Sequence, residues 1–221
     1  MTSFVLKIIA LISMLFDHLG YTIFNNFSFM NYIGRLSFPI FAFCLTEGYI
    51  HTKNLGKYFF RLGIFAIISQ IPYMLFESTF SNNFNLNILF TLLLGLLAIT
   101  LFNKIKNKLL GYIIVILCAI IAQFFYFDYG WFGIATIFLF YIFKNKKSYM
   151  NIFFILITFI NYYFQFIQTS RYEYLLIIPF ACLSLIPINL YNGKKGTDSR
   201  YLLYIFYPLH LMVLYLIKYF A

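Results

Sequence analysis

The chain has 221 residues, of which 63% are apolar and only 10% are charged, and its mean hydropathy is +0.86. Soluble domains carry about 25% charged residues, so this composition excludes an ordinary soluble domain. The formal net charge of +10 does not indicate a nucleic-acid partner, because the basic residues lie in short clusters between apolar segments.

Nine apolar segments of roughly membrane-spanning length follow one another along the chain. They cover residues 4–24, 31–51, 58–77, 85–102, 109–125, 129–143, 149–167, 172–191 and 201–219. Such continuous apolar segments favour helices over the alternating strands of a membrane barrel. The sequence therefore predicts an all-α, polytopic integral membrane bundle of about nine transmembrane helices, with residues 1–221 as one domain. An oligomer is compatible with this sequence, because lipid-facing and subunit-facing apolar surfaces look alike.

Charged residues alternate between the loops. Every second loop is basic, with Lys53, Lys57, Lys104, Lys106, Lys108, Lys144, Lys146, Lys147, Lys194, Lys195 and Arg200. The other loops hold Glu77, Asp128 and Glu173, with Arg171 as their clear base. Because basic loops stay in the cytoplasm, the pattern predicts a multi-pass membrane protein with a cytoplasmic N-terminus and, with nine helices, a C-terminus on the outside.

The first apolar segment contains the adjacent ionisable residues Asp17 and His18. An Asp at the centre of a membrane helix costs at least ~2.5 kcal/mol, so such residues face partners, cavities or substrates. At this depth we favour a functional pair over a structural one. Asp17 either orients His18 or pairs with Arg35, which lies at nearly the same depth in the second segment.

Further polar residues lie along the other segments. Glu47 and His51 share one face near the cytoplasmic end, close in depth to Arg61, and form either an ion-pair network or a vestibule for an anionic ligand. Asn87 either joins helices or donates to a developing oxyanion. In the last segment, Tyr207 and His210 are three residues apart beside a proline and either line a cavity or are structural.

Several stretches together resemble the TraX family of bacterial membrane proteins. They are Lys7-IIALISMLFDHLG, Gly34-RLSFPIFAF with Glu47-GYIHT, Arg61-LGIFAIISQIPY, Asn87-ILFTLLLGLL and Tyr204-IFYPLHL. They cover the first hundred residues and the last twenty. TraX is similar to the wider transmembrane acyltransferase superfamily, in which a basic residue precedes a histidine by eleven positions in the first helix, as Lys7 precedes His18.

The resemblance implies an acetyltransferase that takes acetyl-CoA from the cytoplasm and acylates an envelope acceptor, either pilin or a glycan. His18 is then the general base, set by Asp17 or Arg35, although an acetyl-histidine intermediate is a competing mechanism. The candidate catalytic residues are His18, Asp17, Asn87 and His210. The candidate acetyl-CoA-binding residues are Lys7, Arg35, Arg61, His51, Glu47 and Tyr207. No metal site is predicted, because the three cysteines lack ligand spacing.

Two other classes of protein fit parts of the pattern. Buried Asp, Arg and His also mark proton-coupled transporters, which often show repeats with broken helices in corresponding halves. Here the deep polar residues gather in the first four segments and the last, which favours an enzyme. A purely structural membrane subunit is disfavoured by the cost of so many buried polar groups.

Overall fold

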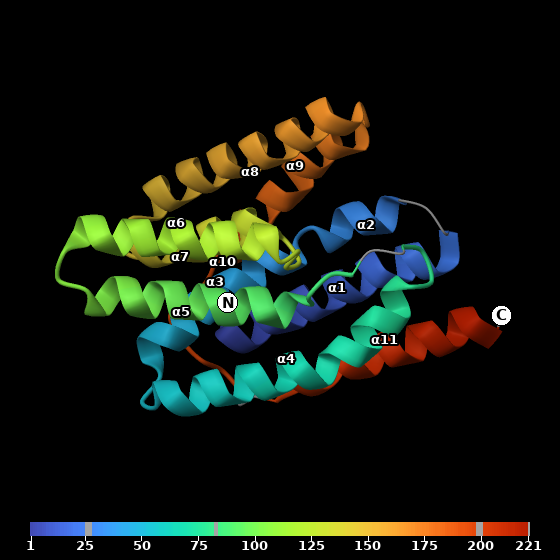
Figure 1. Cartoon of the computed structure of the whole chain (residues 1–221), viewed down its shortest axis with the longest axis horizontal. Helices are drawn as coiled ribbons and strands as arrows, with labels where there is room; N and C mark the ends of the chain where they lie inside the picture. The colour runs from blue at the N-terminus through green and yellow to red at the C-terminus, as the bar shows by residue number, and fades with distance from the viewer. Residues whose placement is uncertain (25–27, 82–83, 198–200, 221) are drawn as a thin grey trace.

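A computed structural model describes residues 1–24, 28–81, 84–197 and 201–220. These residues form eleven helices (Figure 1): α1 Ser3–Phe24, α2 Phe29–Gly34, α3 Ser37–His51, α4 Leu55–Glu77, α5 Ile88–Lys104, α6 Lys108–Phe124, α7 Gly130–Ile142, α8 Lys147–Thr169, α9 Glu173–Leu183, α10 Leu185–Asn189 and α11 Leu202–Phe220. No strand forms among them, so the prediction of an all-α fold is confirmed.

Two of the nine predicted segments are broken, each three to four residues before a proline. A proline lacks the N–H that would bond the carbonyl four positions earlier, and its ring clashes with that carbonyl. Pro39 therefore accounts for the break between α2 and α3 after Gly34, and Pro187 for the break between α9 and α10 at Ser184. The prolines inside α4, α9 and α11 leave those helices continuous.

Successive long helices run in opposite directions, so their connections lie at the two ends of the bundle (Figure 1). One end holds the connections at 51–55, 104–108 and 142–147, together with residues 189–197 and the N-terminus, and we call it the basic end. The opposite end holds residues 77–81 and 84–88 and the connections at 124–130 and 169–173. All the loop lysines named above lie at the basic end; Arg200 lies outside the described residues.

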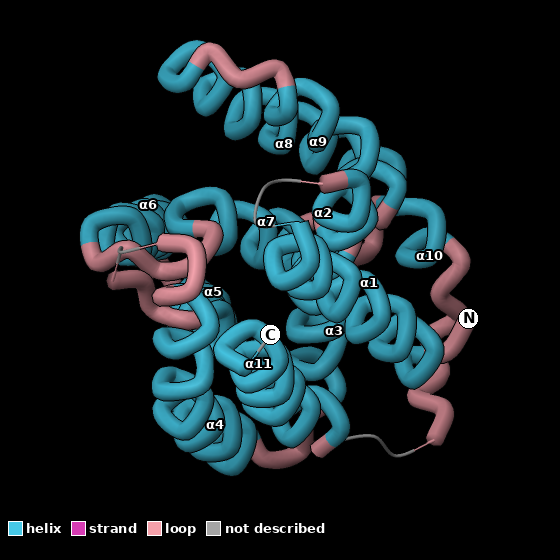
Figure 2. The backbone as a smooth tube through the Cα atoms, turned by 90° about the vertical axis from the view of Figure 1, so that its right-hand side faces the viewer, coloured by secondary structure: helices cyan, strands magenta, loops and turns pink. Residues whose placement is uncertain are grey.

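Four helices are long and apolar enough to cross a membrane: α1, α4, α8 and α11. The shorter apolar helices are α5, α6 and α7, together with α9 and α10, which form one apolar stretch over Glu173–Asn189. One large apolar core joins α1, α3, α4, α5, α6, α7, α10 and α11 with the first half of α8, and the far end of the α8–α9 hairpin stands out from the rest (Figure 2). The outward faces of α6 and α8 are covered with exposed aliphatic and aromatic side chains, as lipid contact requires.

Candidate functional site

Two histidines from opposite ends of the chain meet inside the bundle. His18 on α1 and His210 on α11 are joined by a hydrogen bond of 2.7 Å between Nδ1 of His18 and Nε2 of His210. The other nitrogen of His210, Nδ1, lies 2.8 Å from the backbone carbonyl of Phe206, one turn earlier on α11. His210 is only 6% exposed, and the ring of Phe76 lies 5.2 Å from that of His18.

The carbonyl fixes the direction of this chain of hydrogen bonds. A carbonyl oxygen only accepts, so Nδ1 of His210 carries a proton. With both rings neutral, Nε2 of His210 then accepts and Nδ1 of His18 donates. This leaves Nε2 of His18 unprotonated, and it has no hydrogen-bond partner among the described residues. We call the three groups the histidine relay: the Phe206 carbonyl, His210 and His18.

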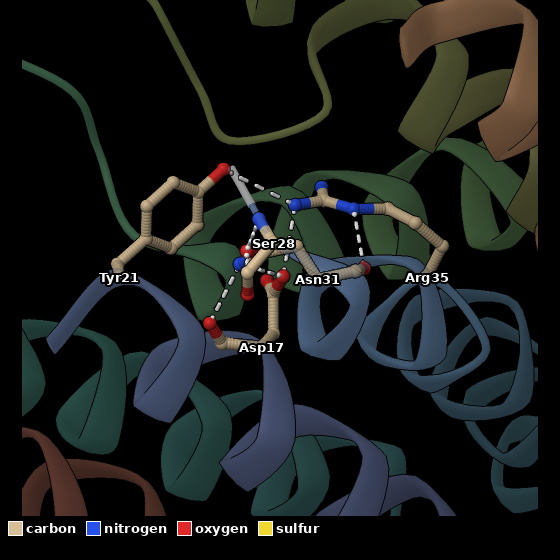
Figure 3. Close-up of polar contacts among 5 residues, drawn as sticks. All are labelled: Asp17, Tyr21, Ser28, Asn31 and Arg35. Carbon is tan, nitrogen blue, oxygen red and sulfur yellow. Dashed lines mark hydrogen bonds and ion pairs between the residues drawn. The ribbon is translucent and has the colours of Figure 1, made fainter. Parts of the chain in front are cut away.

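Asp17, the neighbour of His18, belongs to a separate set of contacts (Figure 3). Its Oδ1 atom accepts from Nη2 of Arg35 at 2.9 Å and from Nδ2 of Asn31 at 3.0 Å. Asn31 also donates to the Asp17 backbone carbonyl, and Arg35 reaches the Tyr21 hydroxyl at 3.5 Å. We call these four residues the Asp17 cluster. Of the two partners considered from the sequence, Asp17 therefore takes Arg35 and not His18.

Two glycines let α2 approach α1 closely enough for this cluster. A Cβ atom at Gly34 would lie 2.3 Å from Cβ of Asp17, and one at Gly20 would lie 2.7 Å from Oδ1 of Asn31. Sequence reasoning missed Asn31, which is fully buried. Its position four residues before Arg35, on the same helical face, is the signal that identifies it.

The remaining predicted residues near the basic end form a second polar group. Oε2 of Glu47 lies 3.5 Å from Nε2 of His51, whose side chain is 65% exposed. Glu47 also accepts a hydrogen bond from the hydroxyl of Tyr191. Lys7 and Glu47 both lie near Cys44. Arg61 hydrogen-bonds the hydroxyl of Tyr204, while its buried Nε atom has no partner in the described part of the chain.

Arg35 was predicted to bind acetyl-CoA together with Lys7 and Arg61, and the structure does not bring these residues together. Arg35 pairs with Asp17, which lies ten residues, or about 15 Å, beyond Lys7 along α1. Its guanidinium is thus held at the end of the bundle opposite the lysines.

Asn87 has a structural role that conflicts with its predicted role as an oxyanion donor. Its Oδ1 caps α5 by accepting from the Leu89 amide, and its Nδ2 donates to the Ala66 carbonyl and to the Gln70 side chain, both at 2.8 Å. Both amide protons are thereby used, so none is left for an acyl oxygen. Tyr207 is likewise buried in the core, where its hydroxyl shares a hydrogen bond with the Ile88 backbone; it does not reach the basic end.

A polar cavity of about 790 Å³ opens at the opposite end, between α2, α8, residues 77–81 and 85, and the connection at 124–130. Tyr21 and Arg35 of the Asp17 cluster line it, as does Asp128, which sequence reasoning used only for topology. Burial raises the pKa of Asp128 from its ordinary 3.8 to about 7; Arg35 lowers it, and Glu77 and Asp17 raise it. Tyr21 follows His18 by three residues, so the cavity begins one helical turn from the relay.

The chain is similar to known proteins over nearly its whole length. The family described as TraX protein matches residues 3–218. The chain is 27% identical over 237 positions to the "Probable fimbrial assembly protein FimC, serogroup H1" of Dichelobacter nodosus, an alignment that covers 96% of this chain and 94% of that protein. No solved structure matches. The histidine relay and the Asp17 cluster are therefore features of a chain that belongs to the TraX family.

Proposed function

We propose that this protein is an integral membrane acetyltransferase that moves an acetyl group from acetyl-CoA to an amine or hydroxyl of a cell-envelope acceptor. The observation that carries the proposal is the unpartnered, unprotonated Nε2 atom of His18 at the end of the histidine relay. A positioned imidazole with a free nitrogen is the commonest general base in enzymes. The Asp17 cluster, in which the carboxylate is satisfied by Arg35 and Asn31, holds α1 beside it.

The transfer needs one proton acceptor and no metal. Nε2 of His18 takes the proton of the acceptor amine or hydroxyl while that nitrogen or oxygen bonds to the acetyl carbon. The carbon–sulfur bond then breaks, and the CoA thiolate leaves and takes the proton back from His18. His210 and the Phe206 carbonyl hold the ring in the correct tautomer and stabilise the transient imidazolium, as an orienting partner does for the base of a catalytic triad.

The two ends of the bundle fit the two substrates. We place the basic end in the cytoplasm, with the nine apolar segments crossing the cytoplasmic membrane in turn. The CoA phosphates then meet Lys7, Arg61 and the loop lysines, and the pantetheine arm reaches His18 about 16 Å further along α1. The fimbrial assembly relative favours a pilin subunit as the acceptor, with a glycan as the alternative.

The experiment is label transfer in proteoliposomes. Wild-type protein with radiolabelled acetyl-CoA and an envelope extract should label an acceptor, and His18→Ala should reduce the rate by about 10²- to 10⁴-fold. Ile12→Ala truncates a 51% exposed side chain of the same helix and serves as the matched control. A His18→Ala protein that transfers label at the wild-type rate refutes the proposal, as does dissipation of a pH gradient without transfer, which would identify a transporter.

A further inference from the structure

A second hollow lies beside the polar cavity, on the lipid-facing side of α7. It is a groove of about 650 Å³ between α6 and α8. Its walls are aliphatic and aromatic, with Val115 and Ala119 from α6, Ala135 and Phe138 from α7, and Phe153 from α8. Groove and cavity share two lining residues, Gln123 and Trp131, so they meet at the start of α7. The apolar groove along α7 therefore adjoins the polar cavity at the end opposite the lysines, and we call the two together the cleft.

The lining of the groove indicates what it holds. Membrane helices pack closely through small residues. Five of the 13 residues that line the groove are aromatic, namely Tyr112, Trp131, Phe138, Phe143 and Phe153, and only two are alanines. A partner helix packs poorly against such bulky rings, whereas a flexible hydrocarbon chain can follow the gaps between them.

The charge of the polar cavity indicates the head group. Three carboxylates line it, from Glu77, Asp128 and Glu173, against the two guanidinium groups of Arg35 and Arg171. Arg35 is already paired within the Asp17 cluster, so acid is in excess. Asp128 accepts a hydrogen bond from the Tyr129 backbone and has no side-chain partner among the described residues. A cationic group satisfies this carboxylate, and Arg171, exposed at the rim, suits a phosphate.

We propose that the cleft is a binding site for an amphiphilic lipid with an amine-bearing head group. One acyl chain lies in the groove along α7, and the ammonium group lies in the polar cavity beside Asp128. The lipid enters sideways from the bilayer, because the groove opens between the lipid-facing helices α6 and α8. This site does not depend on acetyl transfer.

The chain carries its own reporter for this site. Trp131, the single tryptophan of the sequence, lies where groove and cavity meet. Full-length protein in phosphatidylglycerol nanodiscs is titrated with phosphatidylethanolamine whose acyl chains carry bromine, which quenches tryptophan on contact. The parallel titration uses brominated phosphatidylglycerol. We expect the amine-bearing lipid to reach half-maximal quenching at a membrane fraction at least about threefold lower than the lipid without an amine.

Two variants separate the head from the chain. Asp128→Asn should abolish the preference for the amine while quenching by both lipids persists. Ala135→Phe fills the groove and should raise the half-quenching fraction for both lipids, whereas Ile113→Phe, on the exposed face of α6 outside the groove, should leave it unchanged. If Ala135→Phe is not recovered as a folded, monodisperse protein, Ala119→Phe makes the same test from α6.

Three outcomes overturn the inference. The first is equal titration by the two brominated lipids in wild-type protein. The second is a folded groove-filling variant that quenches like wild type. The third is loss of quenching when a single-span hydrophobic peptide is added, which would make the occupant a helix. None of these readouts involves label transfer, so their failure leaves the proposed acetyltransferase reaction untouched.

Discussion

Asp17 and His18 are adjacent in the sequence but belong to two hydrogen-bond systems of different kinds. One oxygen of the Asp17 carboxylate accepts from a guanidinium and an amide, and the side chain packs closely against Gly34. The histidine relay is a directed chain that ends in a free nitrogen. Because neighbours on a helix point about 100° apart, one helix presents both without their touching.

The difference shows how a membrane protein handles costly polar groups. A closed cluster fixes two helices against each other and leaves nothing for chemistry. An open relay is less saturated and keeps one atom available for a substrate. Whether a buried polar residue is structural or functional is therefore indicated by its unused donors and acceptors, and not by its depth in the bilayer.

Breaking the closed cluster should give the largest effect, on stability. Arg35→Ala leaves the Asp17 carboxylate, 14% exposed, without its cation, and should lower the free energy of unfolding by about 3–5 kcal/mol. Thermal unfolding in detergent measures this. The double variant Arg35→Leu with Asp17→Leu removes both charges and should recover much of the loss. A single Arg35→Ala as stable as wild type would show that the cluster does not hold α1 to α2.

Breaking the relay should instead affect activity. His210→Ala removes the group that orients His18 and should lower the label-transfer rate by about a hundredfold while the unfolding temperature changes little. His210→Gln keeps an acceptor near Nδ1 of His18 and should restore part of the rate. If both variants lose transfer rate and also unfold at a lower temperature, the role of His210 is structural.

Asn87 tests the same division on α5. Since its side chain caps that helix, Asn87→Ala should lower the free energy of unfolding by about 1–2 kcal/mol, and Asn87→Ser, which also caps, by less. Unfolding and label transfer are measured side by side. Transfer lost at wild-type stability would return Asn87 to its predicted role as an oxyanion donor.

Asp128, which forms no salt bridge among the described residues, should show the smallest effect and a distinctive dependence on pH. Its folded-state pKa of about 7 lies above the ordinary 3.8, so the folded chain holds the proton between these values and loses stability as pH rises through that window. Asp128→Asn should flatten this slope and stabilise the protein above pH 7 by on the order of 1 kcal/mol. Unfolding midpoints from pH 4 to pH 8 give the comparison, and an unchanged slope in the variant contradicts the assignment.

The sequence predicted the fold class and the helical segments well, because composition and hydrophobic length determine them. Each of the nine apolar segments is helical in the described residues. The sequence analysis missed the helix breaks before Pro39 and Pro187, although proline chemistry accounts for both. A proline alone does not predict a break in this chain, because helices α4 and α11 continue through Pro72 and Pro208.

The candidate site was predicted less completely. Depth along the helices identified Asp17 and Arg35 as a plausible pair, and their contact is present. The meeting of His18 with His210 depends on how α1 packs against α11, which no local pattern encodes. For Asn87 the sequence left both roles open, because a side chain that caps a helix and one that awaits a substrate look identical in a sequence.

The N-terminal residues pair with a late part of the chain, and this has a consequence for assembly. Ser3 and Phe4 donate their backbone amides to the carbonyls of Lys194 and Lys195, and His18 meets a ring 192 positions further on. A membrane chain is synthesised and inserted from its N-terminus. Helix α1 therefore lacks its packing partner α11, and His18 lacks its hydrogen bond to His210, until the last helix has been inserted. A truncated or half-inserted chain lacks the relay, because the relay forms only once α11 is in place beside α1.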